Sequence, residues 1–265
     1  MAIQRQASGR GAVGWARQVH PDLPPDEALV RLGEELVHVC RLDEPDPVAA
    51  WRERTELLVG VAERLNARRF DALRFAGEGT DLTVGLLPTT RFLAAEFTTV
   101  DGIRHMPNLP SEEVFGAPDP QRTEGVVRAT KPLVVAGSIV RGLEVEFRGG
   151  RAVRIDAEDN ADVLRGYAAR DEGAARLGEV ALVDGEGRIG RLGTTFFDTL
   201  LDENAASHVA LGQAYAFTAG DEDRDRLNRS GIHVDFMIGG DDVDVSGVTS
   251  RGDEVPVLRG GAWQV

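Results

Sequence analysis

A histidine and an aspartate stand two residues apart in an otherwise apolar run, residues 230–239. If this run is a β-strand, His233 and Asp235 project from one face and the apolar residues from the other. Side chains two apart on a strand lie about 6.5–7 Å from each other, so both can reach one metal ion. Each can also reach one member of a metal pair about 3.5–4 Å apart. A solvated strand face is the alternative interpretation.

Residues 198–212 contain a second polar group inside an apolar stretch, namely Asp202, Glu203, Asn204 and His208. Polar groups in apolar surroundings cost free energy unless something compensates them, and a metal ion can do so. The alternative is the end of a helix followed by a strand with one hydrogen-bonded histidine.

Acidic residues at two other places in the chain are weaker candidates for a functional site. Glu112 and Glu113 are adjacent acids between prolines, in a segment that we interpret as a Pro-rich loop over residues 105–120. Solvated acids in a turn are the alternative there. Glu179 is a single acid just before an apolar strand.

Histidines and carboxylates without cysteine favour Zn²⁺, Co²⁺ or Mn²⁺, and one acid can bridge two such ions. The single cysteine, Cys40, excludes a thiolate zinc site and an internal disulfide, and is expected to be a core side chain. Sequence templates for a P-loop, a Gly-x-Ser-x-Gly nucleophile elbow and a His-Glu-x-x-His zinc helix are missing.

Composition narrows the class of protein. The chain has 265 residues, 42% of them hydrophobic and 28% charged, which predicts one or two folded domains with a sizeable core. A net charge of −14 without a long basic stripe argues against nucleic acid as a partner. The longest uncharged stretch, residues 204–220, is too short and polar to span a membrane, and the N-terminal ten residues lack the apolar core of a signal peptide.

Hydrophobic periodicity predicts helices first and strands afterwards. The predicted helices cover residues 27–42, 46–66 (Asp46 as N-cap), 162–170 and 194–201 (capped by a threonine). The predicted strands cover residues 72–76, 81–86, 92–97, 126–130, 133–140, 143–148, 152–155, 180–183, 208–217, 231–238, 243–245 and 254–258, with a hairpin turn at Gly149-Gly150. This is an α+β pattern: a helical N-terminal part followed by a strand-rich domain with mixed or antiparallel sheet. A boundary near residue 105 divides the chain into 1–105 and 106–265, unless both parts form one domain.

Four segments in order resemble the signature of the M29 family of metallo-aminopeptidases, which includes aminopeptidase T and AmpS. They are residues 108–115, 177–182, 202–215 and 232–239; Asp46-Pro47 with Trp51, and residues 79–86, also fit. The resemblance implies a cytoplasmic, homodimeric enzyme whose strand-rich part is the catalytic domain. Such an enzyme releases N-terminal amino acids from peptides with a free N-terminus. It uses two divalent metal ions, Zn²⁺ or Co²⁺ with Mn²⁺ and Mg²⁺ as alternatives, and a hydroxide that bridges them.

The same resemblance implies roles for individual residues. The metal ligands would be Glu113, Glu179, His208, His233 and Asp235, with Glu179 as the bridge. Tyr215 would be the catalytic tyrosine, which donates a hydrogen bond to the developing oxyanion. Glu203 would be a ligand or an acid beside the ligands.

The likeness begins near Gly14, and the chain shows no counterpart of the family's N-terminal domain. An alternative function is therefore an inactive, N-terminally truncated family member that binds metal or is purely structural. A third is a β-rich interaction module without metal. Metal content together with turnover distinguishes the three.

Overall fold

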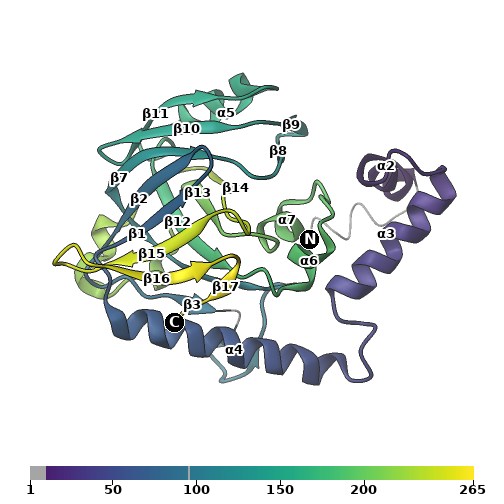
Figure 1. Ribbon diagram of the computed structural model, residues 1–265, viewed down its shortest axis with the longest axis horizontal. Helices are drawn as coiled ribbons and strands as arrows, with labels where there is room; N and C mark the ends of the chain where they lie inside the picture. Colours follow the sequence, from purple (N-terminus) through teal and green to yellow (C-terminus); the bar gives the residue numbers. More distant parts are fainter. Residues whose placement is uncertain (1–9, 95) are drawn as a thin grey trace.

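The computed structural model describes residues 10–94 and 96–265, in which helices come first and strands dominate the rest (Figure 1). The α-helices are α2 (Arg10–Val19), α3 (Pro25–Val39), α4 (Pro47–Arg68), α5 (Ala161–Ala168), α6 (Arg188–Leu192) and α7 (Thr199–Glu203). Two short 3-10 helices are η1 (Ala216–Thr218) and η2 (Asp221–Arg226). The expectation of no signal peptide concerns residues 1–9 for the most part, which lie outside the described residues.

The strands form two main antiparallel sheets. The larger contains β1 (Ala72–Gly77), β2 (Thr80–Leu86), β7 (Pro118–Arg128), β10 (Glu144–Arg148), β11 (Arg151–Asp156), β15 (Asp244–Val248), β16 (Glu254–Arg259) and β17 (Ala262–Trp263), in the order β11-β10-β7-β2-β1-β15-β16-β17. The smaller contains β3 (Leu93–Ala94), β6 (Glu113–Gly116), β12 (Leu177–Val183), β13 (His208–Gly212) and β14 (His233–Met237), in the order β14-β13-β12-β6-β3. Two ribbons pair β4 (Phe97–Thr98) with β5 (Arg104–His105) and β8 (Leu133–Val135) with β9 (Ser138–Val140). The α+β class is confirmed, with antiparallel pairing throughout the described strands.

The main hydrophobic core lies between the two sheets and α4, which runs along one side of them beneath β3 (Figure 1). Its large, fully buried side chains include Phe75, Phe147 and Phe236. A second, smaller core joins α2 and α3 to α6 and α7, and there the Trp15 indole donates a hydrogen bond to the Phe196 carbonyl at 2.5 Å. Within the described ranges, no helix is both long and apolar enough to cross a bilayer.

Local signals predicted several helix ends and turns correctly. The Asp46 side chain accepts a hydrogen bond from the Ala49 amide at 3.0 Å, and Pro47 occupies the first turn of α4, as expected of an N-cap followed by proline. The Gly149-Gly150 turn joins β10 to β11, and both glycines have positive φ angles of 55° and 76°. The predicted end of the first helix at residue 42 was wrong, because α3 ends three residues earlier, at Val39, and Arg41 has a φ of 58°.

Other expectations were wrong. The Pro-rich segment is not a loop throughout, because it contains β6 and the start of β7, both stabilised by pairing with distant strands. The predicted helix at 194–201 begins only at Thr199, where Asp198 rather than a threonine is the N-cap. The predicted strand at 208–217 ends at Gly212, whose φ of 106° breaks the ladder. Helix α2 was not predicted.

Two further predicted strands are interrupted in the structure. The strand at 133–140 is the hairpin β8–β9, turning at Ala136 and Gly137. The strand at 92–97 corresponds to β3 and β4, and residue 95 between them lies outside the described residues. The larger sheet takes strands from both sides of the boundary near residue 105, and the division into two domains stays a prediction.

Candidate metal centre

The smaller sheet brings the five predicted metal ligands to one of its faces. They are Glu113 on β6, Glu179 on β12, His208 on β13, and His233 and Asp235 on β14. In the strand register, Val183 is opposite Glu113, Ala181 opposite His208, and Ala210 opposite Asp235. Residues opposite each other share a face, as do residues two apart on one strand. The pairing therefore places all five side chains on the same side of four adjacent strands.

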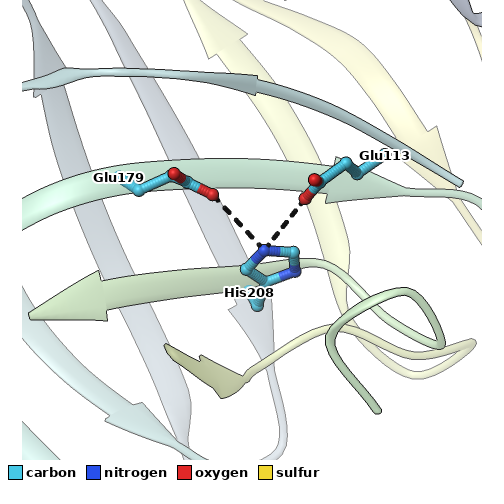
Figure 2. A group of neighbouring side chains, drawn as sticks. All are labelled: Glu113, Glu179 and His208. Atoms are coloured by element: carbon cyan, nitrogen blue, oxygen red, sulfur yellow. Dashed lines mark ion pairs between the residues drawn. The ribbon is translucent and has the colours of Figure 1, made fainter. Parts of the chain in front are cut away.

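Glu113, Glu179 and His208 form the first cluster (Figure 2). The His208 Nε2 atom lies 3.1 Å from Glu113 Oε2 and 3.6 Å from Glu179 Oε1. Figure 2 shows both carboxylates pointing toward the same imidazole nitrogen. One potential ligand atom from each residue lies within 4.8 Å of the others, close enough for a single ion to bind all three.

Glu179, His233 and Asp235 form the second cluster. His233 Nε2 lies 3.2 Å from Asp235 Oδ1 and 3.8 Å from Glu179 Oε2. Glu179 therefore belongs to both clusters, with one carboxylate oxygen facing each histidine. A carboxylate in this position has the geometry of a bridge between two cations.

Both imidazoles are oriented by the backbone. His233 Nδ1 lies 2.8 Å from the Gln213 carbonyl oxygen, and His208 Nδ1 lies 3.2 Å from that of Ala206. A ring nitrogen that donates to a carbonyl leaves the other nitrogen, Nε2, as the potential ligand. In both rings Nε2 is the atom that faces the carboxylates.

Burial and like charge perturb the acids of this centre. Burial, reinforced by the charges of Glu113 and Asp235, raises the pKa of Glu179. Burial also raises the pKa of Glu203 well above its ordinary value, and the charge of Asp235 adds to this effect. Burial would raise the pKa of Asp235 too, but its ion pair with His233 outweighs burial and lowers the pKa.

The histidines show the opposite balance. Burial lowers the pKa of His233, but the hydrogen bond and charge of Asp235 outweigh it and raise the pKa to about 9. Burial likewise opposes protonation of His208, but its contacts with Glu113 and Glu179 raise the pKa well above the ordinary value. Without metal, both imidazoles therefore hold protons at neutral pH.

The centre fits a pair of cations. Four carboxyl groups, including that of Glu203, surround two imidazoles, so full ionisation of the acids exceeds what two imidazolium charges can balance. Among the described residues, the buried Glu113 Oε2 atom faces only another predicted ligand, the His208 Nε2 atom at 3.1 Å. A buried carboxylate oxygen is costly without a partner, and a cation would satisfy it once the imidazole has lost the proton between them. The nitrogen and oxygen donors suit Zn²⁺, Co²⁺ or Mn²⁺.

A cavity of about 430 Å³ opens beside the two clusters and is lined by Glu113, Glu179, Glu203, His233 and Asp235. Aromatic side chains form another part of its lining: Phe97, Phe115, Tyr215 and Phe217.

Tyr215 stacks on Phe217 with ring centroids 5.3 Å apart, and its ring lies 5.3 Å from that of His233. Burial and the nearby acids raise the pKa of Tyr215 to about 12, so its hydroxyl stays a hydrogen-bond donor at neutral pH.

Not every polar residue singled out from the sequence lies at the centre. The Asp202 carboxylate accepts hydrogen bonds from the amides of Phe196 and Asp198, at 2.7 and 3.1 Å. Asn204 accepts one from the Glu112 amide at 2.6 Å. Backbone amides therefore compensate these two side chains, whereas His208 belongs to the first cluster and Glu203 lines the cavity beside both clusters. The aromatic lining was not identified as such from the sequence, because isolated phenylalanines carry no spacing signal.

Comparisons of the sequence and of the structure with known proteins point to one family of metalloproteases. The model of a family described as thermophilic metalloprotease (M29) matches residues 11–263. Aminopeptidase T of Thermus aquaticus is 48% identical over 95% of this chain and 63% of its own length. Aminopeptidase AmpS of Bacillus subtilis is 39% identical over 96% of this chain and 64% of its own length. The solved structure of wild-type AmpT from Thermus thermophilus superposes with a TM-score of 0.89 at 46% identity, covering 96% of this chain and 63% of that one. The chain thus spans somewhat less than two thirds of these relatives.

Proposed function

Because the chain belongs to the M29 metalloprotease family, we propose that it is a dinuclear metallo-aminopeptidase that removes N-terminal residues from peptides. The observation that carries this proposal is the pair of ligand clusters that share Glu179. Glu113 and His208 would complete one metal site, and His233 and Asp235 the other. Zn²⁺ and Co²⁺ are the ions we favour for this donor set, with Mn²⁺ and Mg²⁺ as alternatives.

Two ions bound there would lower the pKa of a shared water and polarise the scissile carbonyl. Glu203 supplies a buried carboxyl group with a raised pKa in the same cavity, suited to accept a proton from the nucleophile and return it to the leaving amine. The Tyr215 hydroxyl donates a hydrogen bond to the oxygen on which negative charge develops. The free α-amine of the substrate enters a cavity lined by four acids, and its positive charge favours binding there.

The quaternary state and location are part of the same proposal. The family resemblance favours a cytoplasmic homodimer, and exposed apolar side chains on the N-terminal helices, Val30 and Val37 among them, offer a surface for association. Light scattering of the purified chain would measure the mass and decide between monomer and dimer.

Metal removal tests the proposal as a whole. Purified protein loaded with Co²⁺ or Zn²⁺ is expected to hydrolyse aminoacyl-p-nitroanilides, to lose this activity in a chelator and to regain it when metal is restored. An N-acetylated substrate, which lacks the free amine, is the control and should not be cleaved. Hydrolysis that survives complete metal removal would contradict the mechanism. Two bound ions per chain without turnover would instead identify an inactive family member.

Substitution of Tyr215 by phenylalanine is expected to lower kcat by about 10²–10³-fold, because it removes one donor to the oxyanion. KM and metal content should stay close to those of the wild type. Tyr167→Phe, which alters the only other tyrosine of the chain, is the matched control and should leave kcat unchanged. Steady-state kinetics with metal analysis measures both. An unchanged kcat in Tyr215→Phe would remove the tyrosine from the mechanism.

A further inference from the structure

A buried ionic network lies next to the metal centre. It surrounds the start of β6, where Glu113 lies, and the end of β12, where the residue paired with Glu113 lies. Glu112 directly precedes β6, and Asp184 directly follows β12, where Glu113 and Val183 form the last register pair of the two strands. Arg54 of α4 contacts both acids: its Nε donates to Glu112, and its two terminal nitrogens donate to Asp184 at 3.0 and 2.8 Å. The exposed fractions are 0% for Glu112, 2% for Asp184 and 7% for Arg54. A single guanidinium group thus joins the ends of two ligand-bearing strands.

Glu112 has two further anchors. Arg41, from the segment between α3 and α4, donates to Glu112 Oε1 at 2.8 Å. The Glu112 amide donates to Asn204 Oδ1 at 2.6 Å, and the Asn204 amide group in turn donates to the Leu200 carbonyl at 2.9 Å. Asn204 immediately follows Glu203 at the end of α7. Glu112 is therefore held from the α3–α4 segment, from α4 and from α7.

Glu113 differs from the two histidine ligands in how its side chain is held. Each histidine is oriented by a contact between its own Nδ1 and a backbone carbonyl. The side-chain contact of Glu113 is with another ligand, the His208 Nε2 atom at 3.1 Å, and among the described residues no group outside the cluster hydrogen-bonds its Oε2 atom. The contacts that hold Glu113 from outside the cluster reach it through its backbone, because they attach to the preceding residue, Glu112.

The chemistry of the network also favours a positioning role. The charges of the two arginines balance those of the two acids, with Arg54, Glu112 and Asp184 buried and Arg41 partly buried. Such groups contribute little net stability compared with well-packed apolar residues. What they provide is directional contact: the planar fork of Arg54 reaches two carboxylates at once, which a lysine ammonium on one flexible stem cannot do equally well.

We propose that Glu112, held by Arg54, Arg41 and Asn204, is a positioning residue that sets the metal affinity of the Glu113–Glu179–His208 cluster. The inference rests on the proposed function, since it presumes that this cluster binds a metal ion. Groups that orient metal ligands from outside the coordination sphere typically change metal affinity by about 10- to 100-fold when they are altered.

Two single substitutions, each of which removes one histidine ligand, allow metal binding at the other cluster to be measured alone. His233→Ala leaves the Glu113–Glu179–His208 cluster intact, and His208→Ala leaves the Glu179–His233–Asp235 cluster intact. Arg54→Lys, which conserves charge, is introduced into each background, and Co²⁺ binding is titrated by visible absorption and calorimetry. We expect Co²⁺ affinity to fall about 10- to 100-fold in the His233→Ala background and to change less than about threefold in the His208→Ala background.

Glu112→Gln is the second variant, and Glu35→Gln is its matched control. Glu35 is 3% exposed and pairs with His20 and Arg31 at 3.0 and 2.9 Å, so it is also a buried acid with two basic partners. Both substitutions should lower the melting temperature, but only Glu112→Gln should weaken Co²⁺ binding selectively. If Glu112→Gln does not fold, the charge-conserving Arg54→Lys variant decides.

The outcomes distinguish the inference from its premise. If Arg54→Lys lowered Co²⁺ affinity equally in both backgrounds, the network would only stabilise the fold as a whole, and the inference would be overturned. Wild-type protein that binds two ions, and retains both affinities in Arg54→Lys, would also overturn it while leaving the proposed function standing. Wild-type protein that binds no metal would refute the proposed function itself.

Discussion

Glu179→Gln is expected to abolish binding of both metal ions and to lower the rate of peptide hydrolysis by at least about 10³-fold, the scale of several kcal/mol of transition-state stabilisation. Glu179 is the only residue common to the two clusters, with Oε1 toward His208 and Oε2 toward His233. Glutamine keeps the size of the side chain but replaces one ligand oxygen by an NH₂ group that cannot bind a cation. Metal analysis after gel filtration, together with initial rates, measures the effect.

Variants at residues of one cluster are the comparison for Glu179→Gln. Glu113→Gln and Asp235→Asn each alter a single cluster, so each is expected to weaken one ion while the other stays bound. Glu35→Gln, in α3, is the control for loss of a buried carboxylate and should retain both ions. If Glu179→Gln bound two ions with wild-type affinity, the assignment of Glu179 as the bridge would be wrong.

Metal binding is expected to strengthen steeply as the pH rises. In the metal-free protein the pKa of His233 is raised to about 9, and that of His208 is raised well above its ordinary value. Both imidazoles are therefore protonated near pH 7, and a metal ion must displace one proton from each. Raising the pH removes this competition, so the affinity of each site should increase by up to about tenfold per pH unit between pH 6 and 8.

Calorimetry in buffers of different ionisation enthalpy checks this sign and counts the protons. About two protons should be released when both sites fill near pH 7. His233→Ala removes one of these protons together with one site, so the remaining site should release about one. Affinity that is independent of pH, or proton uptake on binding, would contradict the ionisation states given above.

Much of the candidate centre was visible in the sequence as separate pieces. Alternation around His233 and Asp235 placed both on one strand face, and the apolar surroundings of His208 singled it out. These features depend on neighbours along the chain, as do the Asp46 cap of α4 and the Gly149-Gly150 turn. The residues alone could not connect Glu113 or Glu179 with the histidines. Only the family resemblance joined them, and their assignment as ligands stays a prediction.

The placement of Glu112 and Glu113 was decided by pairing between strands that are far apart in the sequence. The sequence predicted a loop around Glu112 and Glu113 because prolines and adjacent acids are typical of turns. In the structure β6 instead pairs with β12 and β3, and the alternation of a strand gives the two acids different surroundings. Glu113 faces the clusters, and Glu112 contacts Arg54 and Arg41.

What the sequence by itself determined about this protein is therefore its α+β class, several local caps and turns, and part of the group of histidines and acids proposed to bind metal. Such features follow from backbone preferences and from periodicity over a few residues. The order β14-β13-β12-β6, and the register that gathers side chains from Glu113 to Asp235 on one face, were decided by the tertiary structure. The physical reason is that strand order and register depend on packing between segments far apart in the chain, where a shift of one residue turns a ligand to the opposite face.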